Sequence, residues 1–425
     1  MRSRREIRLV PLTSLALVLC LFTAVDAQAQ TPSPPLPDRP LRLADCLALS
    51  EQRQPSLLVA RARLAAAQSR VASLDNLHGP VVRLRQDLPL RRQQARLGID
   101  AAQAELARLE VENRYVVTRA YLSVLYARAQ RNVLDDAIDD LRYLRERVRA
   151  SVEKKERPEW TAATVDLVTL YLRRIEARRA EAERGIALSL AALREALFLE
   201  PTVCLNIAEE PIPQPAVHVC REDIIAAAAA RRGEVIEASA ASEAAALETD
   251  VQATFCRRGS INTFASGADL HAKHVPQPIY GEEFRPGGVP LAMPHTLVGP
   301  RPNRVETAQD LSVQATAVAQ KTRSLVILEA EEAYYNWEEW SRKAVLLGEA
   351  AKIGDRLERE LREEYRGALK RLIDALVPES VLAAQTRTDY NEALFRQAIA
   401  LAALERVTGG VFCAGLAKPP APTQP

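Results

Sequence analysis

The sequence of 425 residues lacks the features by which most enzymes are recognised. It contains no glycine-rich phosphate-binding loop, no GxSxG elbow and no HExxH zinc motif. His271 and His274 lie three residues apart, but a third metal ligand is missing nearby, so we expect a surface loop there. We therefore expect no catalytic site, no cofactor and no metal site.

Long apolar runs and an excess of charge are also missing. Beyond the N-terminus no stretch approaches the roughly 18 uncharged residues of a transmembrane helix. The chain contains 57 Lys and Arg residues and 55 Asp and Glu residues. The first 27 residues hold four of the basic and two of the acidic residues, so 53 charges of each sign remain. A neutral chain has no electrostatic reason to bind nucleic acid, which we exclude as a partner.

The first 29 residues have the pattern of a signal peptide. Four arginines within the first eight residues precede an apolar run from Leu9 to Val25, and small residues follow at the cleavage positions, as in Ala27-Gln28-Ala29. This pattern predicts export, with the mature chain starting near residue 30.

Five cysteines follow the predicted signal peptide, so at least one is free or pairs between chains. Cys204 and Cys220 bracket a proline-rich segment. They either close a disulfide, which would contribute about 3 kcal/mol, or remain two free thiols.

Proline is concentrated in four short segments, and the stretches between them predict helices. Segments 31–40, 201–215, 276–302 and 419–425 hold all but six of the 26 prolines. Between them, apolar residues recur at intervals of three and four among Ala, Leu, Glu, Arg and Gln. The pattern predicts a mainly α fold with helices at 44–76, 91–153, 160–199, 223–255, 307–365 and 379–408.

The chain also repeats itself. Arg53-Gln54-Pro55 matches Arg231-Arg232-Gly233 at an offset of 178, Ala120-Tyr121 matches Ala333-Tyr334 at 213, and Ala191–Glu195 matches Ala402–Arg406 at 211. In each half we expect the long helix to pack against two shorter ones stacked end to end. The predicted organisation is a lead-in at 30–43, a first helical repeat at 44–200, a linker at 201–222, a second repeat at 223–412 with an insertion at 256–306, and a tail at 413–425.

Three stretches resemble the TolC family of outer membrane efflux proteins: Leu41–Ser50 followed by Gln54-Pro55, Val116–Tyr126 with its Ala120-Tyr121, and Tyr390–Phe395 running to Gly409. The resemblance covers residues 41–412. It implies long antiparallel helical hairpins in two tandem repeats, which form an α-barrel as a homotrimer.

The same resemblance implies a function. It suggests a passive duct of a tripartite efflux or type I secretion system, which conducts exported small molecules or polypeptides. Its place would be the cell outer membrane, with most of the chain in the periplasm, and its partners a periplasmic adaptor, an inner-membrane pump and outer membrane lipid. A periplasmic coiled-coil scaffold or adaptor that does not span the membrane is the alternative, because residues 276–302 carry seven prolines.

The connections between helices depart from the family pattern. The first, at 77–90, is too short for two membrane-spanning strands of about nine to eleven residues each. The second, at 256–306, predicts only two short strands, around Ile261–Phe264 and Asp269–Ala272.

The corners at 154–161 and 366–380 are candidate tips of such a duct. Pro158 and Pro378 mark them, and Asp374 and Glu379 beside the second corner would form an acidic ring around a threefold axis. Glu379 has the alternative role of capping the helix after Pro378. These four residues are our candidate gate.

Two further features have competing interpretations. The cluster Tyr334, Tyr335, Trp337 and Trp340 predicts packing between helices or subunits, with a substrate-binding stripe as the alternative. The mixed-charge run from Asp355 to Arg366 predicts a solvated face, or in a tubular trimer part of the bore.

Overall fold

The computed structural model describes residues 39–78, 85–155, 160–256, 259–267, 293–364 and 372–417, with only the backbone of 361–364 and 372–380. The predicted signal peptide, most of the lead-in, Pro158, the histidine pair and most of the tail lie outside these residues. Residues from Pro40 onward belong to one compact unit.

The described chain is mainly helical, as the sequence predicts. The first half contains α2 (Leu43–Arg53), α3 (Pro55–Asp75), α5 (Leu88–Glu153) and α6 (Ala162–Ala196). The second half contains α7 (Arg221–Arg231), α8 (Gly233–Thr254), α9 (Arg301–Glu364) and α10 (Leu372–Val407). The 66 residues of α5 and 64 of α9 correspond to lengths of about 99 and 96 Å.

The helices repeat at the offsets read from the sequence. α2 and α7 begin 178 residues apart, at Leu43 and Arg221, and so do α3 and α8, at Pro55 and Gly233. α5 and α9 begin 213 residues apart, and α6 and α10 end 211 apart. The two halves are therefore two copies of one helical arrangement.

Each predicted first helix is broken in two. Gln54 and Arg232 have extended backbones and separate α2 from α3 and α7 from α8. Pro55 occupies the first turn of α3, where its missing N–H has no partner in a helix anyway. The single helices predicted at 44–76 and 223–255 are therefore corrected to pairs.

The long helices α5 and α9 begin earlier than predicted, because proline is tolerated in the first turn of a helix. Pro89 is the second residue of α5, and Pro302 is the second residue of α9. α10 begins at Leu372, so Pro378 lies inside a helix and not in the turn where we predicted it. Without an N–H, Pro378 cannot bond the carbonyl of Asp374.

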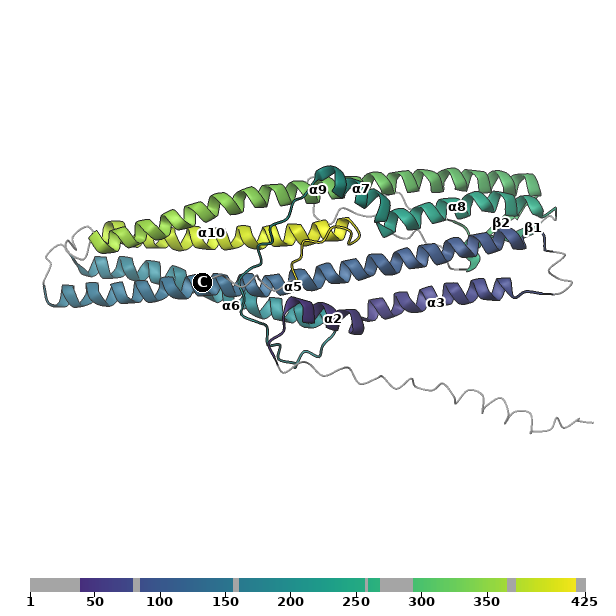
Figure 1. The fold of residues 1–425 in the computed structure, drawn as a ribbon. Helices are drawn as coiled ribbons and strands as arrows, with labels where there is room; N and C mark the ends of the chain where they lie inside the picture. The colour runs from purple at the N-terminus through teal and green to yellow at the C-terminus, as the bar shows by residue number, and fades with distance from the viewer. Residues whose placement is uncertain are drawn as a thin grey trace, which may run out of the picture. The chain divides into compact units, whose positions relative to one another are not determined.

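Each long helix packs along two shorter partners in line. α5 contacts α6 on one part of its length and α2 and α3 on the other, and α9 contacts α10, α7 and α8 in the same way (Figure 1). The two halves meet where α5 also contacts α8 and α10. The predicted packing of one long helix against two stacked shorter ones is confirmed.

Apolar side chains at spacings of three and four join α5 to α6. Leu134, Ile138 and Leu141 of α5 form one buried cluster with Leu172 and Ile175 of α6. Burying an aliphatic side chain of this size contributes about 1.5–3 kcal/mol, so this cluster holds the first hairpin together.

One short antiparallel sheet lies within the described residues. β1 (Gly259–Asn262) pairs with β2 (Thr296–Gly299), with Ile261 opposite Leu297. β1 overlaps the first predicted strand, whereas Asp269–Ala272 falls outside the described residues. β2 was missed because Pro294 and Pro300 flank it inside a proline cluster.

None of the described helices combines the length and apolarity that crossing a bilayer requires.

The five described cysteines are all free, so Cys204 and Cys220 form no disulfide in this structure. Burial raises the pKa of the Cys46 thiol to about 12, with Asp45 adding to the effect, which makes this thiol unreactive.

Gly233 allows α8 to begin against the backbone of α5. A Cβ at this position would lie 2.6 Å from the Ala104 carbonyl oxygen. We expect Gly233→Ala to lower the free energy of unfolding by about 1–3 kcal/mol, measured by urea denaturation followed by circular dichroism. Gly185→Ala in α6 is the control: its Cβ would make an ordinary 3.5 Å contact with Ala127 of α5, so the free energy of unfolding should rise by about 0.5–1 kcal/mol. Equal effects would refute this explanation.

Candidate functional site at the junction of the two halves

Four buried charged residues meet at the middle of the long helices, and we call them the junction network: Arg232, Glu234, Glu329 and Arg406. Arg232 separates α7 from α8, Glu234 follows in the first turn of α8, Glu329 is near the middle of α9, and Arg406 is in the last turn of α10. Each is at most 8% exposed. Burying a charged side chain costs a large amount of free energy unless it is paired with an opposite charge.

Glu329 is the centre of the junction network. Its Oε1 accepts a hydrogen bond from Arg406 at 2.5 Å, and its Oε2 lies 2.9 Å from Arg232 Nη2. Arg232 also donates to both carboxylate oxygens of Glu234, at 2.9 and 3.1 Å. Burial alone would lower the pKa of Arg232, but Glu234 and Glu329 more than offset it and raise that pKa, so the guanidinium stays charged.

Arg406 extends the junction network to the first half. Its guanidinium lies 5.2 Å from the ring centre of Tyr115, and its Nη1 is 3.5 Å from Glu112 Oε2. Both of these partners belong to α5. One arginine therefore connects the last turn of α10 to the long helices of both halves.

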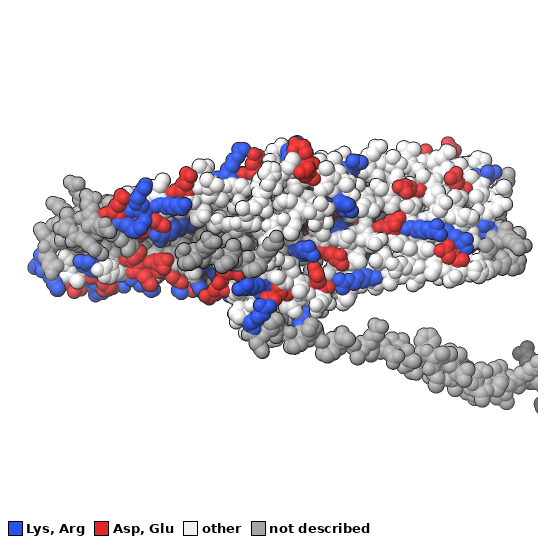
Figure 2. Space-filling view, viewed as in Figure 1, with Lys and Arg blue, Asp and Glu red and all other residues white. Residues whose placement is uncertain are grey.

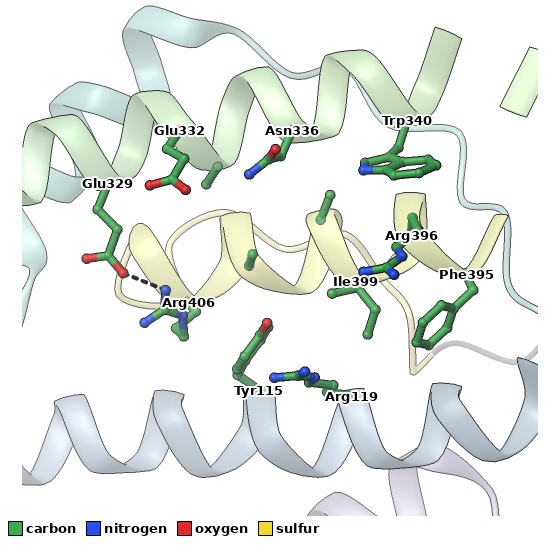
Figure 3. A pocket seen from close by; sticks show the side chains of 13 residues that line it. Tyr115, Arg119, Glu329, Glu332, Asn336, Trp340, Phe395, Arg396, Ile399 and Arg406 are labelled. Carbon is green, nitrogen blue, oxygen red and sulfur yellow. Dashed lines mark hydrogen bonds and ion pairs between the residues drawn. The ribbon is translucent and has the colours of Figure 1, made fainter. Parts of the chain in front are cut away.

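A cavity of about 280 Å³ adjoins the junction network between α5, α9 and α10 (Figure 3). Tyr115, Trp340 and Phe395 give it aromatic walls, and Glu332 lines it from α9. Burial raises the pKa of Glu332, and the nearby charge of Glu329 adds to the effect. The lining residues include no serine, cysteine or histidine, so the cavity offers no Ser–His or Cys–His pair.

The first half has an uncharged arrangement at the matching place. Ser50 Oγ lies 2.9 Å both from Asn113 Oδ1 and from the carbonyl oxygen of Ala196, and Gln54 donates to the same carbonyl at 3.2 Å. Gln54 is the repeat counterpart of Arg232. The two halves therefore close the same helix junction with different chemistry.

A second buried network lies where β1 and β2 leave the helices. Glu248 of α8 is fully buried and accepts hydrogen bonds from Arg91 at 2.7 Å and from Gln252 at 2.7 Å. Gln252 in turn accepts from Arg304, which is also fully buried and donates to the carbonyls of Phe255 and Gly299. These contacts fix the first turns of α5 and α9 to α8.

Toward the corners, an acidic groove separates α5 from the α9–α10 hairpin. Asp136, Asp139 and Asp140 of α5 face Asp355, Glu358, Arg359 and Arg387 across it. Arg387 joins α10 to α9, with 2.6 Å to Asp355 and 3.1 Å to Glu358. Five carboxylates against two arginines leave the groove negative. In Figure 2 the charged side chains are denser at this end than over α8.

The described residues do not test the predicted gate. Pro158 lies outside the described residues, and only the backbone of Asp374, Pro378 and Glu379 is described, within α10. Their role as a gate remains a prediction. No group of three or more His, Cys, Asp or Glu in the described part of the chain is placed to hold a metal ion.

The aromatic cluster on α9 divides between packing and exposure. Tyr334 contacts Tyr335 and Trp337, with ring centres 5.6 and 5.8 Å apart. Trp340 lines the cavity and lies under Lys343 at 4.3 Å, whereas Tyr335 is 52% exposed.

The predicted solvated face at 355–366 is only partly free, since Asp355 and Glu358 form ion pairs with Arg387.

Sequence reasoning did not identify the junction network. In the sequence, Arg232 is part of one repeat match, and Arg406 is part of another and of the closing stretch. The available signal was the placement of Glu329 and Arg406 among apolar helix positions, where an unpaired charge would be too costly. Which charge pairs with which depends on contacts between residues 77 and 97 positions apart, Glu329 with Arg406 and with Arg232, which no local pattern reveals.

Removing Arg406 should destabilise the protein strongly. Arg406→Met leaves Glu329 buried with one partner fewer, so we expect a loss of about 3–5 kcal/mol in urea denaturation. The control Arg342→Met removes an exposed pair with Glu338 on α9 and should cost about 0–1 kcal/mol. Similar losses for both variants would show that the junction network is not central.

Glu237 on α8 should make stability depend on pH. Burial raises its pKa to about 7, although Arg108 opposes this, while Glu234 and Glu105 reinforce it. The folded protein therefore binds this proton more tightly than the unfolded chain, and stability falls as pH rises from about 4.5 to about 7. We expect Glu237→Gln to gain about 1–3 kcal/mol at pH 8 and almost nothing at pH 4.5. Glu243→Gln, exposed on the same helix, should show no such difference.

The sequence matches no protein-family model, and no curated protein matches it. Solved structures do match. The outer-membrane channel OprN is 15% identical with a TM-score of 0.66, covering 87% of this chain and 90% of that one. The MtrE outer membrane channel of Neisseria gonorrhoeae is 13% identical with a TM-score of 0.64, covering 87% and 89%. The CmeC outer membrane channel of Campylobacter jejuni is 11% identical with a TM-score of 0.68, covering 87% and 86%. The long antiparallel helical hairpins in two tandem repeats, which the resemblance to the TolC family implies, are confirmed for the single chain.

Proposed function

We propose that this protein is the outer membrane channel of a tripartite efflux or type I secretion system. Its role is that of a passive duct, through which small molecules or polypeptides leave the periplasm. The observation that carries the proposal is the fold, which is shared over most of the chain with solved outer membrane channels. Homotrimer formation, and contact with a periplasmic adaptor, an inner-membrane pump and outer membrane lipid, are parts of the same proposal.

The distribution of contacts suggests how such a duct opens. The junction network joins the helices near the middle of α5 and α9. The second buried network joins them at the end where α5 and α9 begin. Toward the corners, α5 and α10 share a hydrogen bond from Gln130 to the carbonyl of Thr388, at 2.9 Å, and the acidic groove follows. Like charges across the groove reduce the cost of moving one hairpin away from the other. Adaptor contact at the corners would then move the α9–α10 hairpin outward.

A scaffold that never enters the membrane was the alternative from the sequence. The fold offers no separate support for it, because the structures that match over most of the chain are outer membrane channels.

Loss of the gene should impair export. We expect a deletion strain to accumulate dyes, antibiotics or a secreted polypeptide, and expression of the intact chain to restore their export. The protein should also remain in the outer membrane fraction after carbonate washing. Unchanged export across a broad panel of substrates would contradict the duct, and release by carbonate would favour the scaffold.

A further inference from the structure

The cavity beside the junction network has the size and lining of a small-molecule site. Its volume of about 280 Å³ suits a molecule with one ring, near the lower end of the range that ligand pockets cover. Short side chains leave this space open: Ala333 of α9 and Ala400 and Ala403 of α10 line it. Longer side chains at these positions would fill the cavity.

The aromatic walls of the cavity are held in place by their neighbours. Phe395 stacks on Tyr126 with ring centres 4.6 Å apart, and the ring centre of Tyr115 lies 5.2 Å from the Arg406 guanidinium. Trp340 and Phe395 lie at the same end of the cavity (Figure 3). A ligand would therefore meet walls that are already ordered, which lowers the entropy cost of binding.

Most of the charges around the cavity are already balanced. Arg406 pairs with Glu329 in the junction network, and Arg396 lies 3.4 Å from Glu392 on its own helix. Glu332 is the exception, because it forms no ion pair or hydrogen bond with another residue in the described part of the chain. This carboxylate is partly buried and lines the cavity beside the aromatic walls.

Burial makes the isolated charge of Glu332 unfavourable. It raises the pKa of this carboxyl, and the charge of Glu329 raises it further, while Arg406 opposes the shift. From α5, Tyr115 and Arg119 face the same cavity, and Arg119 is exposed to solvent. A cation bound beside Glu332 would supply the missing opposite charge.

The helical repeat does not require this chemistry. At the offset of 213, Glu332 and Trp340 correspond to Arg119 and Ala127 of α5. The first half therefore has neither the carboxylate nor the indole at these positions, although α5 also packs along two shorter helices of its own half. Because the same packing forms without these two side chains, their presence favours a role in binding.

We propose that this cavity binds a small organic cation, in which an ammonium group is attached to an apolar body. The ammonium lies beside Glu332, and the apolar body lies along Tyr115 towards Phe395 and Trp340. An anion of the same shape would meet two carboxylates, Glu332 and Glu329, so the site selects for the sign of the charge as well as for an apolar body. Binding is a property of the single chain and goes beyond the proposed duct.

The first test compares three probes that share a phenyl ring and differ in charge: phenethylammonium, phenethyl alcohol and hydrocinnamate. In isothermal titration calorimetry of the purified protein at about pH 8, phenethylammonium should bind about ten-fold or more tightly than the alcohol, and hydrocinnamate should bind most weakly. Absence of phenethylammonium binding at about 10 mM would overturn the proposal, and so would equal or tighter binding of the alcohol or the anion.

The second test removes the charge of Glu332. Glu332→Gln should weaken phenethylammonium binding about ten-fold and leave phenethyl alcohol binding unchanged. Glu349→Gln, which alters an exposed carboxylate of α9 away from the cavity, is the control and should bind both probes as the wild type does. Full affinity for the cation in Glu332→Gln would overturn the proposal.

The affinity for the cation should also depend on pH. As Glu332 loses its proton between about pH 4.5 and pH 8, phenethylammonium should bind more tightly to the wild type, and this gain should be absent in Glu332→Gln. The same gain in both proteins would show that another group attracts the cation.

The third test fills the cavity. Ala403→Leu should abolish binding of phenethylammonium and of phenethyl alcohol, while circular dichroism shows that the helix content is kept. Retained binding would place the probes outside the cavity and overturn the proposal. Because the readout is binding to the purified chain, a protein that binds the cation but whose deletion leaves export unchanged would contradict only the duct.

Discussion

The carboxylate of Glu329 is the contact on which the arrangement of the long helices depends. It neutralises Arg232 at the break between α7 and α8 and Arg406 at the end of α10, and Arg406 reaches α5 in turn. Four helices therefore converge on one buried anion. Because each charge would be costly to bury alone, the network specifies which helix ends meet as well as joining them.

The two halves show how one architecture tolerates different junction chemistry. In the first half the place of Arg232 is taken by Gln54, which bonds a backbone carbonyl, and Ser50 and Asn113 complete a neutral arrangement. In the second half the same break is charged. The difference follows position in the chain: the second-half junction faces α5 and must join two halves, whereas the first-half junction joins helices of its own half. A neutral set suffices for the second task.

The two long helices differ in their contacts. α5 contacts helices of both halves, whereas α9, among the described elements, makes its main contacts with α7, α8, α10 and β2 of the second half. Several large apolar residues of α9, among them Tyr335, Leu346 and Ile353, are more than half exposed.

The sequence alone determined the helical class, the two halves and their offsets, because helix periodicity and proline exclusion are local properties. It placed the starts of α5, α9 and α10 too late, after Pro89, Pro302 and Pro378. Proline is tolerated in the first turn of α5 and α9, and α10 contains Pro378 within its second turn. It missed β2, whose pairing with β1 joins residues 34 to 40 positions apart. The junction network and the cavity beside it were decided only by the tertiary structure. Whether an arginine is buried beside a carboxylate, or an apolar residue is left uncovered, depends on which distant helix lies against it.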